Sequence, residues 1–213
     1  MNVSKDDMIL YAVTDRTWLN GETLEKQVEK AIVGGATFVQ LREKECSRKE
    51  FLELAEKIKK VTEQYNVPFV INDDVEIAIA CNADGVHIGQ SDMELKAARK
   101  KLGDKKIIGV SAKTVEQAKE AQINGADYLG VGAVFPTSTK KDANCISIDT
   151  IREICQNVTI PVVAIGGIQK DNVLNLKGIG VDGIAVISGI FASENVKEAT
   201  RTLRQLSQQL VKK

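Results

Sequence analysis

The sequence predicts an α/β protein, a (β/α)8 TIM barrel formed as one domain from residues 1–213. Three observations support this fold. Short apolar runs recur along the chain without the strict alternation of a strand that has one wet face, which is typical of parallel strands buried on both sides. Amphipathic helical segments separate these runs. Eight such units in 213 residues leave about 27 residues for each, near the lower end for a closed eight-stranded barrel.

The predicted strands are short and mostly apolar on both faces. The first reads ILYAVTD and the last reads GIAVISG. In chain order we expect strands at residues 9–15, 37–43, 68–73, 85–89, 107–111, 128–134, 161–167 and 183–189.

Capping signals mark the helices between the strands. Ser47 and Glu50 match a capping box, in which two side chains satisfy backbone N–H groups at a helix start, and Thr114 and Gln117 repeat the pattern. Left-handed stops at helix ends are expected at Gly34-Gly35, Asn124-Gly125 and Gly178. Four similar helix-to-strand junctions, GGATFVQ, CNADGVHIG, INGADYLGVG and GVDGIAVISG, indicate one recurring βα unit.

The alternative fold is an open, doubly wound sheet. Such a sheet often binds a dinucleotide through a G-x-G-x-x-G turn after its first strand, and that turn is absent here. The sequence shows no shift in composition and no linker rich in Pro, Gly or Ser that would divide the chain. We therefore expect the closed barrel, in one domain.

Composition restricts the classes of partner. Lys plus Arg (29) equals Asp plus Glu (29), so no overall field draws the chain to nucleic acid or to an anionic membrane, and a small ligand is favoured. The four cysteines form no C-x-x-C pair, and His87 is the only histidine, which disfavours zinc. Asp6 and Asp7 stand where a signal peptide carries basic residues, and no segment has the ~18 apolar residues of a membrane span. We expect a soluble, cytoplasmic protein with reduced thiols.

Cationic side chains follow the second predicted strand. Gln40 and Arg42 share one face because they are two residues apart, and Lys44 continues that alternation into the loop. An arginine inside a barrel is expensive unless it is paired or meets an anion such as a phosphate. The alternative is a structural ion pair between Arg42 and an acid at a strand end.

Carboxylates follow the third and fourth strands. Asp73, beside Asn72, and Asp92 both belong to the loops at the mouth of the barrel. Two carboxylates beside cationic side chains suggest Mg²⁺, which one or two carboxylates hold together with substrate phosphates. The alternative is that Asp73, Asp74 and Asp92 simply cap the helices that follow them.

Other polar positions point to the same mouth. His87 is expected to be a hydrogen-bonded interior histidine rather than a catalytic base, and the Ser111 hydroxyl reaches either a phosphate or the backbone. The loops AIGGI (164–168) and VISGI (186–190) end the seventh and eighth strands. In phosphate-binding barrels these two loops offer backbone N–H groups, and a short helix N-terminus, to a phosphate.

Seven motifs in order resemble the thiamine-phosphate synthase family. They are YAVTD (11–15), QLREK (40–44), IND (71–73), DGVHIGQSD (84–92), FPTSTKKDA (135–143), AIGGI (164–168) and GIAVIS (183–188). The resemblance covers nearly the whole chain. It implies a transferase of thiamine biosynthesis that joins an aminopyrimidine methyl diphosphate to a thiazole ethyl phosphate, as its carboxythiazole tautomer, giving thiamine phosphate and pyrophosphate. In this family pyrophosphate is thought to leave first, and the thiazole nitrogen then captures a pyrimidine carbocation.

The resemblance also implies roles for single residues. Asp73 and Asp92 would hold one Mg²⁺ per subunit. The residues expected to bind the pyrimidine diphosphate are Gln40, Leu41, Arg42, Glu43, Lys44, Asn72, Ser111 and Lys140, among which Arg42, Lys44, Ser111 and Lys140 are the candidate catalytic groups. The residues expected to bind the thiazole phosphate are Thr137, Ser138, Thr139, Gly167, Ile187 and Ser188.

The chain departs from the family pattern at Lys113, where many relatives have histidine, so the role of this side chain is open. Two alternative functions are a thiazole tautomerase with the same barrel and a non-catalytic sensor of thiamine precursors. The tautomerase has no use for the metal carboxylates or the full set of cations, and a sensor could keep its ligand contacts while its metal site decayed, whereas this sequence retains both. Generic phosphate-binding barrels share the glycine loops but lack QLREK and FPTSTKK. A homo-oligomer is left open.

Overall fold

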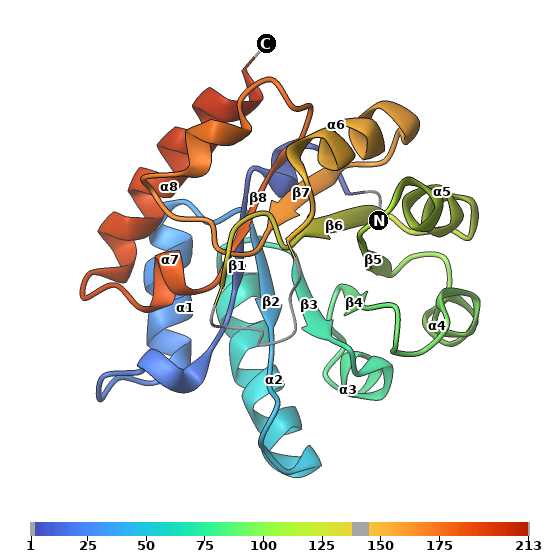
Figure 1. The fold of residues 1–213 in the computed structure, drawn as a ribbon. Helices are drawn as coiled ribbons and strands as arrows, with labels where there is room; N and C mark the ends of the chain where they lie inside the picture. Colours follow the sequence, from blue (N-terminus) through green and yellow to red (C-terminus); the bar gives the residue numbers. More distant parts are fainter. Residues whose placement is uncertain (1–2, 138–144, 213) are drawn as a thin grey trace.

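A computed structural model describes residues 3–137 and 145–212 of the chain. Eight parallel strands, ordered β1 to β8, close into a barrel through the pairing of β8 with β1 (Figure 1). The strands are β1 (Leu10–Val13), β2 (Phe38–Leu41), β3 (Phe69–Asn72), β4 (Gly85–Ile88), β5 (Ile107–Ala112), β6 (Tyr128–Gly132), β7 (Val162–Ile165) and β8 (Gly183–Val186). The predicted barrel and all eight predicted strands are confirmed. Most strands are shorter than predicted because their last residues leave the sheet and form the loops at its mouth.

Helices surround the barrel (Figure 1). The α-helices are α1 (Leu24–Gly34), α2 (Arg48–Gln64), α3 (Val75–Ala80), α4 (Leu95–Leu102), α5 (Val115–Ile123), α6 (Ile148–Asn157), α7 (Ser188–Phe191) and α8 (Val196–Val211). Three 3-10 turns, η1 (Asp6–Met8), η2 (Arg16–Trp18) and η3 (Val173–Leu176), complete the described elements. Only η3 connects β7 to β8, so the seventh unit has a short turn in place of a full helix. Within the described residues, no helix combines the length and the apolar character needed to cross a membrane.

The predicted helix ends are confirmed with one correction. Ser47 and Glu50 form both hydrogen bonds of a capping box at the start of α2. Thr114 caps α5 by accepting from the N–H of Gln117, but the side chain of Gln117 accepts from the N–H of Lys113 rather than from Thr114. The second box is therefore only half formed, because Gln117 reaches one residue further back. The predicted stops at Gly35, Gly125 and Gly178 all have left-handed backbone angles.

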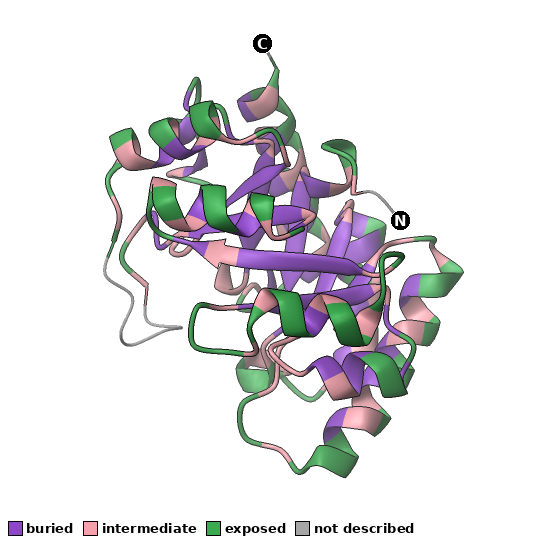
Figure 2. Cartoon of the chain, turned by 90° about the vertical axis from the view of Figure 1, so that its right-hand side faces the viewer, coloured by how far each residue is buried: buried purple, intermediate pink, exposed green. Residues whose placement is uncertain are grey.

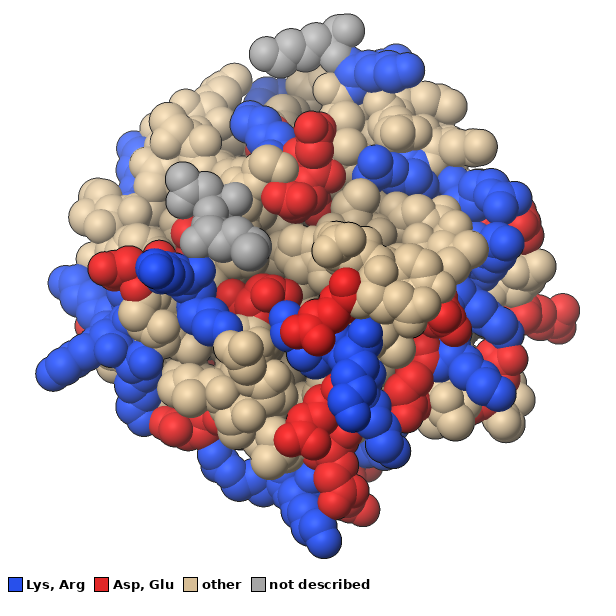
Figure 3. Space-filling view, turned by 180° about the vertical axis from the view of Figure 1, so that it is seen from behind, with Lys and Arg blue, Asp and Glu red and all other residues tan. Residues whose placement is uncertain are grey.

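Two apolar layers stabilise the barrel. The outer layer lies between strands and helices, and it includes Val39 and Leu41 of β2 and Ile58 of α2. The inner layer fills the barrel and includes Tyr11, Phe38 and Tyr128. Figure 2 shows the buried strands enclosed by helices whose exposed faces point outward. Seen from the back of the view in Figure 1, basic and acidic side chains are intermixed over the surface (Figure 3).

Candidate active site

A cavity of about 490 Å³ opens where the strands end. Residues from all eight strands or from the loops that follow them line it. The predicted site residues that line the cavity are Gln40, Arg42, Lys44, Asn72, Asp73, Asp92, Ser111, Thr137, Gly167, Ile187 and Ser188. The structure thus brings together most of the residues that the sequence analysis placed at one mouth. Ser138, Thr139 and Lys140 lie outside the described residues.

Two predicted site residues do not line the cavity. Leu41 is fully buried in the outer layer, facing the helices. The carboxylate of Glu43 is paired with Arg16, whose guanidinium Nη2 lies 2.7 Å from Oε2, and its side chain is only 5% exposed. This follows from strand alternation, since Gln40, Arg42 and Lys44 occupy the opposite face. A contact from either residue to a substrate therefore stays a prediction that the side-chain positions do not favour.

Arg42 lies near a strand-end acid and also lines the cavity, so its position suits both of its predicted roles, a structural ion pair and anion binding. Its guanidinium Nη1 lies 3.8 Å from the carboxylate of Asp15, which follows β1, so a strand-end acid is indeed nearby. The same side chain also lines the cavity. The separation is long for a strong ion pair, and planar guanidinium groups suit phosphate oxygens. Arg42 is thus held at the mouth with donors available to an anionic ligand.

Asp73 has an unusual backbone. Its φ is +64°, in the left-handed region that non-glycine residues rarely adopt, and the N–H of Asp74 donates to the carbonyl of Asn72 over 2.8 Å. This bond closes a γ-turn of the rare form with positive φ, which is strained by about 1–3 kcal/mol. Such strain is typical of functional sites. Here the turn ends β3 abruptly, and the Asp73 side chain lines the cavity.

The capping alternative is right for Asp74 and wrong for Asp73 and Asp92. Asp74 accepts from the N–H of Ile77 over 2.8 Å at the start of α3. Asp92 instead accepts from the N–H of Gly89 over 2.6 Å, within the loop after β4, and helix α4 begins only at Leu95. Both cavity carboxylates are therefore available to a ligand on their remaining oxygen positions.

The carboxyl groups of Asp73 and Asp92 interact with each other. Burial by itself would raise the pKa of Asp73, but hydrogen bonds with Lys44 and Asp92 outweigh it and hold this pKa below its usual value. Burial and the hydrogen bond with Asp73 raise the pKa of Asp92. Lys44 Nζ lies 2.8 Å from Asp73 Oδ2. Two carboxylates that repel each other when both are ionised suit a hard divalent cation, which would relieve that repulsion.

Metal binding would depend on these two carboxylates. Within residues 3–137 and 145–212, this cavity included, no group of three or more His, Cys, Asp or Glu side chains could hold a metal ion. Mg²⁺ usually keeps waters and substrate phosphates in its shell, so two carboxylates are a sufficient protein contribution. The donor set of Asp73 and Asp92 therefore fits Mg²⁺.

We call Arg42, Lys44, Asp73, Asp92 and Ser111 the charged side of the cavity. The opposite part, the glycine side, consists of Gly132, Gly166, Gly167, Ile187 and Ser188. Gly166 and Gly167 both have positive φ, of +100° and +65°. The carbonyl of Gly167 accepts from the side chain of Asn172 over 2.9 Å, and α7 begins at Ser188. A short helix therefore follows β8, as it does in phosphate-binding barrels.

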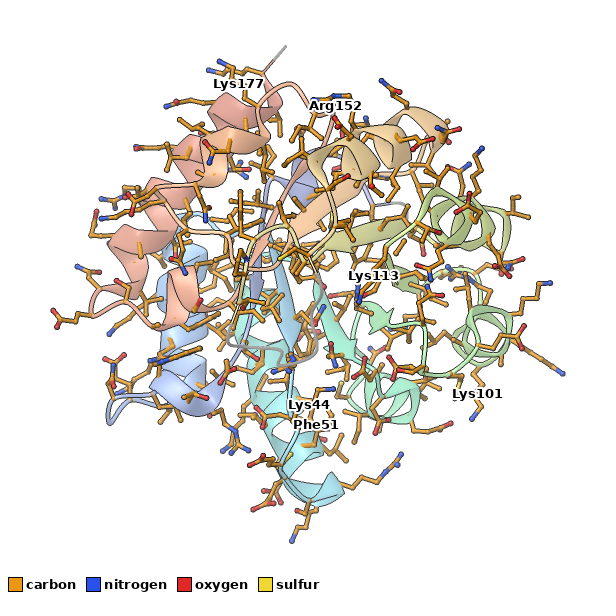
Figure 4. All side chains as sticks on the ribbon, in the orientation of Figure 1. Lys44, Phe51, Lys101, Lys113, Arg152 and Lys177 are labelled. Carbon is orange, nitrogen blue, oxygen red and sulfur yellow. The ribbon has the colours of Figure 1, made fainter. Side chains whose placement is uncertain are left out.

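Sequence reasoning missed several residues of the cavity. Tyr11 and Gln90 line it, and so does Lys113, whose role was open. Tyr11 looked like one more apolar strand residue, so no signal in the sequence set it apart. Gln90 donates from its side chain to the carbonyl of Ser111 over 2.7 Å, which steadies the end of β5. In the view of Figure 4, Lys113 lies beside the barrel strands, whereas Lys101 points outward at the periphery.

His87 is an interior histidine, as expected. Its Nδ1 lies 3.0 Å from the Tyr128 hydroxyl, and its Nε2 lies 2.9 Å from the Ser111 hydroxyl. Ser111 was expected to bond a phosphate or the backbone, and the structure adds His87 as a side-chain partner. His87 is 7% exposed and lines the floor of the cavity.

Known proteins resemble this chain over almost its full length. A family model described as thiamine monophosphate synthase matches residues 10–190. A thiamine-phosphate synthase of Clostridium tetani is 56% identical over 197 residues, covering 92% of this chain and 94% of that protein. One from Alkaliphilus oremlandii is 53% identical over 198 residues, covering 93% and 95%.

Solved structures agree with these matches. A thiamine phosphate pyrophosphorylase from Pyrococcus furiosus superimposes with a TM-score of 0.90 at 40% identity, covering 98% of this chain and 99% of that one. KGPDC from Streptococcus mutans superimposes with a TM-score of 0.73 at 18% identity, covering 97% and 100%, which shows a shared fold alone. The sequence matches, the barrel and the arrangement of its cavity lead to one conclusion: the chain belongs to the thiamine monophosphate synthase family.

Proposed function

We propose that this protein is a thiamine-phosphate synthase, a transferase of thiamine biosynthesis. It joins an aminopyrimidine methyl diphosphate to a thiazole ethyl phosphate and releases pyrophosphate. The observation that carries the proposal is one cavity divided between a charged side and a glycine side. Two phosphorylated substrates need two anion-binding regions whose reactive ends meet, and relatives more than half identical over nine-tenths of the chain are named for this activity.

The charged side is proposed to bind the diphosphate. Arg42 and Lys44 supply positive charge at the ends of β2, and Ser111 supplies a hydroxyl at the end of β5. Bond cleavage leaves negative charge on the departing pyrophosphate, and preorganised donors aimed at that charge lower the barrier most. Lys140, which lies outside the described residues, is carried over from the family motif as a further cation at this site.

Asp73 and Asp92 would hold Mg²⁺ beside the diphosphate. When bound, the ion would neutralise charge on the leaving group. The protein contributes the carboxylate pair, and Lys44 holds Asp73 in place through its 2.8 Å ion pair. The strained γ-turn at Asp73 fixes the backbone from which this carboxylate reaches the cavity.

The glycine side is proposed to bind the thiazole phosphate. Positive φ at Gly166 and Gly167 turns the chain after β7, and Ile187 and Ser188 bring the start of α7 to the same place. Backbone N–H groups at such turns suit a phosphate monoester. Thr137 lies on this cavity as well, and Ser138 and Thr139 are carried over from the family motif.

The reaction then balances without a strong base. The bond between the pyrimidine methylene carbon and the diphosphate oxygen breaks, and its electron pair leaves with pyrophosphate. The lone pair of the thiazole nitrogen forms the new carbon–nitrogen bond. Such chemistry needs charge stabilisation and orientation of the nucleophile. A strong base is therefore not needed, which agrees with a cavity whose single histidine has both ring nitrogens hydrogen-bonded to hydroxyl groups.

The test is direct. The purified chain is incubated with both substrates and Mg²⁺, and thiamine phosphate and pyrophosphate are measured, with omission of each substrate and addition of a chelator as controls. Equal formation of both products supports the proposal, and absence of both with or without metal rejects it. Interconversion of thiazole phosphate tautomers alone would establish the tautomerase alternative, and binding without turnover would establish a sensor.

A cytoplasmic location is proposed as well. All four cysteines are free thiols, which suits a reducing compartment.

A further inference from the structure

A chain of hydrogen bonds crosses the barrel beneath the cavity. The side-chain amide of Gln40 donates to the Tyr11 hydroxyl, which lies 2.8 Å from the Tyr128 hydroxyl. That hydroxyl lies 3.0 Å from Nδ1 of His87, and Nε2 of His87 lies 2.9 Å from Oγ of Ser111. The five side chains come from β2, β1, β6, β4 and β5. We call this set the interior chain; it ends at Ser111 on the charged side.

The direction of each hydrogen bond in the interior chain can be worked out because the two tyrosines at its middle are shielded from solvent. Tyr11 is 1% exposed and Tyr128 is fully buried. Burial raises the pKa of both phenols well above the usual value, so each keeps its proton at neutral pH. A neutral hydroxyl has one proton to donate. A group that accepts from one neighbour along the chain must therefore donate to the next.

The direction of donation follows from Gln40. Its amide nitrogen faces Tyr11, so Tyr11 accepts there and donates to Tyr128. Tyr128 then donates to Nδ1 of His87. A His87 ring that accepts at Nδ1 is neutral and carries its proton on Nε2. That proton goes to Ser111 Oγ, and the proton of Ser111 is left for the cavity.

The opposite direction conflicts with the contact between Gln40 and Tyr11. If Nδ1 of His87 carried a proton, Tyr128 would accept it and donate to Tyr11, and Tyr11 would need the amide oxygen of Gln40 rather than its nitrogen. In the neutral form of that arrangement, Ser111 would give its proton to Nε2 of His87. Only lone pairs of Ser111 would then face the cavity, which would repel an anionic ligand.

Glycines on β5 and β6 make room for the rings. A Cβ atom added to Gly109 would lie 2.1 Å from Cζ of Tyr128 and 2.3 Å from its hydroxyl. A Cβ atom added to Gly130 would lie 3.0 Å from Cε1 of His87. Both rings therefore lie directly against backbone, which fixes them in one place. The edge-to-face contacts of Tyr11 and Tyr128 with Phe38 complete the packing.

We propose that Tyr11 and Tyr128 are positioning residues that hold His87 as the neutral tautomer protonated on Nε2, so that the Ser111 hydroxyl is kept as a donor to the diphosphate. The proposal rests on the proposed function for the identity of the ligand. The tautomer itself does not depend on that function, because it follows from contacts within the protein.

The tautomer is measured first. His87 is the only histidine, so protein labelled with ¹⁵N-histidine gives imidazole signals with one assignment. At neutral pH we expect Nε2 protonated and Nδ1 unprotonated in the wild-type chain. Tyr128→Phe removes the donor to Nδ1 and keeps the ring, so this variant should lose the tautomer preference. Tyr11→Phe should have a smaller effect in the same direction, because Tyr128 keeps its proton.

Enzyme kinetics distinguish a positioning role of Tyr128 from a purely structural one. Tyr128→Phe should lower kcat/KM for the diphosphate substrate about tenfold, the size expected for one misdirected hydrogen bond. In the Ser111→Ala background the same change should have little further effect, because Tyr128 acts through Ser111. Tyr65→Phe is the matched control, since the Tyr65 hydroxyl donates to Glu29 outside the barrel and its loss should change neither tautomer nor rate.

Clear outcomes would overturn the proposal. A wild-type imidazole protonated on Nδ1, a spectrum unchanged by Tyr128→Phe, or additive effects of the Tyr128 and Ser111 substitutions would each do so. If Tyr128→Phe does not fold, the wild-type spectrum and Tyr11→Phe still decide. A wild-type chain that makes no thiamine phosphate would reject the proposed function, whereas its imidazole spectrum would still report on the interior chain.

Discussion

The two sides of the cavity are built by different means. The charged side relies on side chains at the ends of β2 to β5, such as Lys44 and Asp73, while the glycine side relies on backbone shape after β7 and β8. Lys44 is half exposed and paired, whereas Gly167 has no side chain at all. The charged side can therefore be altered by removing a charge, and the glycine side by adding a single methyl group. Substitutions on each side should therefore affect different substrates.

Asp73→Asn is expected to have the largest effect. It removes one of the two carboxylates proposed to hold Mg²⁺, and loss of one preorganised charge of this kind lowers turnover about 100-fold. The Mg²⁺ concentration for half-maximal rate should rise as well. Product formation measured over a range of Mg²⁺ concentrations checks this.

Asp74→Asn is the matched control for this charge. Asp74 is the next residue and caps α3, and asparagine caps helices equally well, so rate and stability should both stay close to wild type. Equal kinetics of the two variants at limiting Mg²⁺ would remove Asp73 from the metal site.

Gly167→Ala tests the glycine side. A Cβ atom here would lie 2.5 Å from the carbonyl oxygen of Pro136 and 2.6 Å from that of Phe135, both backbone atoms that cannot simply rotate away. The displaced loop should raise the KM for the thiazole phosphate roughly tenfold or more, with the Mg²⁺ dependence unchanged. Steady-state kinetics with each substrate varied in turn will show which KM moves.

Gly178→Ala controls for backbone strain. Its φ is +78°, similar to that of Gly167, but a Cβ atom would meet nothing within 4 Å. We expect a loss of about 1 kcal/mol in the free energy of unfolding and no change in either KM. If both alanine variants raise the same KM, the effect at Gly167 is one of global strain rather than of the phosphate loop.

The sequence predicted the barrel well because parallel strands bury both faces and need runs of apolar residues. It also placed Arg42, Lys44 and Asp92 at one mouth, since strand ends converge there. The residue pattern alone could not separate Asp73 from Asp74, two identical neighbours, because their roles depend on the positive φ of Asp73, and only the family motif pointed to Asp73. Only the folded chain shows which carboxylate caps a helix.

The interior chain was invisible for a related reason. Tyr11 and Tyr128 stand among apolar strand residues, and no pattern shows that their hydroxyls meet 2.8 Å apart across 117 positions of sequence. For Leu41 and Glu43 the sequence predicted a role in the site that their positions in the structure do not favour. Strand alternation alone turns them away from Gln40 and Arg42, yet they were carried over with the contiguous family motif.

Lys113→Met should have a smaller effect on the charged side. Lys113 lines the cavity but has no assigned partner among the substrate groups. Removal of its charge should raise the KM for the diphosphate about threefold at low salt, and the difference should shrink at higher ionic strength because exposed charges are screened. Lys101→Met, at a lysine paired with Glu76 on the outer surface, should leave both values unchanged. A salt-independent change at Lys113 would indicate a packing role instead.

Glu43→Gln should have the smallest effect, and it decides whether the charged side includes this residue. If the substrate contacts only the inward residues Arg42 and Lys44, the KM for the diphosphate should stay within about twofold of wild type, as at a site outside the cavity. A tenfold rise would show that Glu43 contacts the ligand. Glu45→Gln, at an exposed position in the same loop, is the matched control.

Stability gives Glu43→Gln a second readout. Burial raises the pKa of Glu43 even though Arg16 opposes the shift, so at neutral pH the ionised carboxylate lowers stability relative to its protonated form. The wild-type chain should gain stability as pH falls through the raised pKa toward the usual value, because the folded state takes up this proton before the unfolded state does. Near pH 7 the glutamine variant should thus be as stable as wild type or more stable, by less than about 1 kcal/mol. Urea unfolding at neutral and mildly acidic pH should show this difference shrinking with acid; a difference that grows instead would mean that the Arg16 pair outweighs burial.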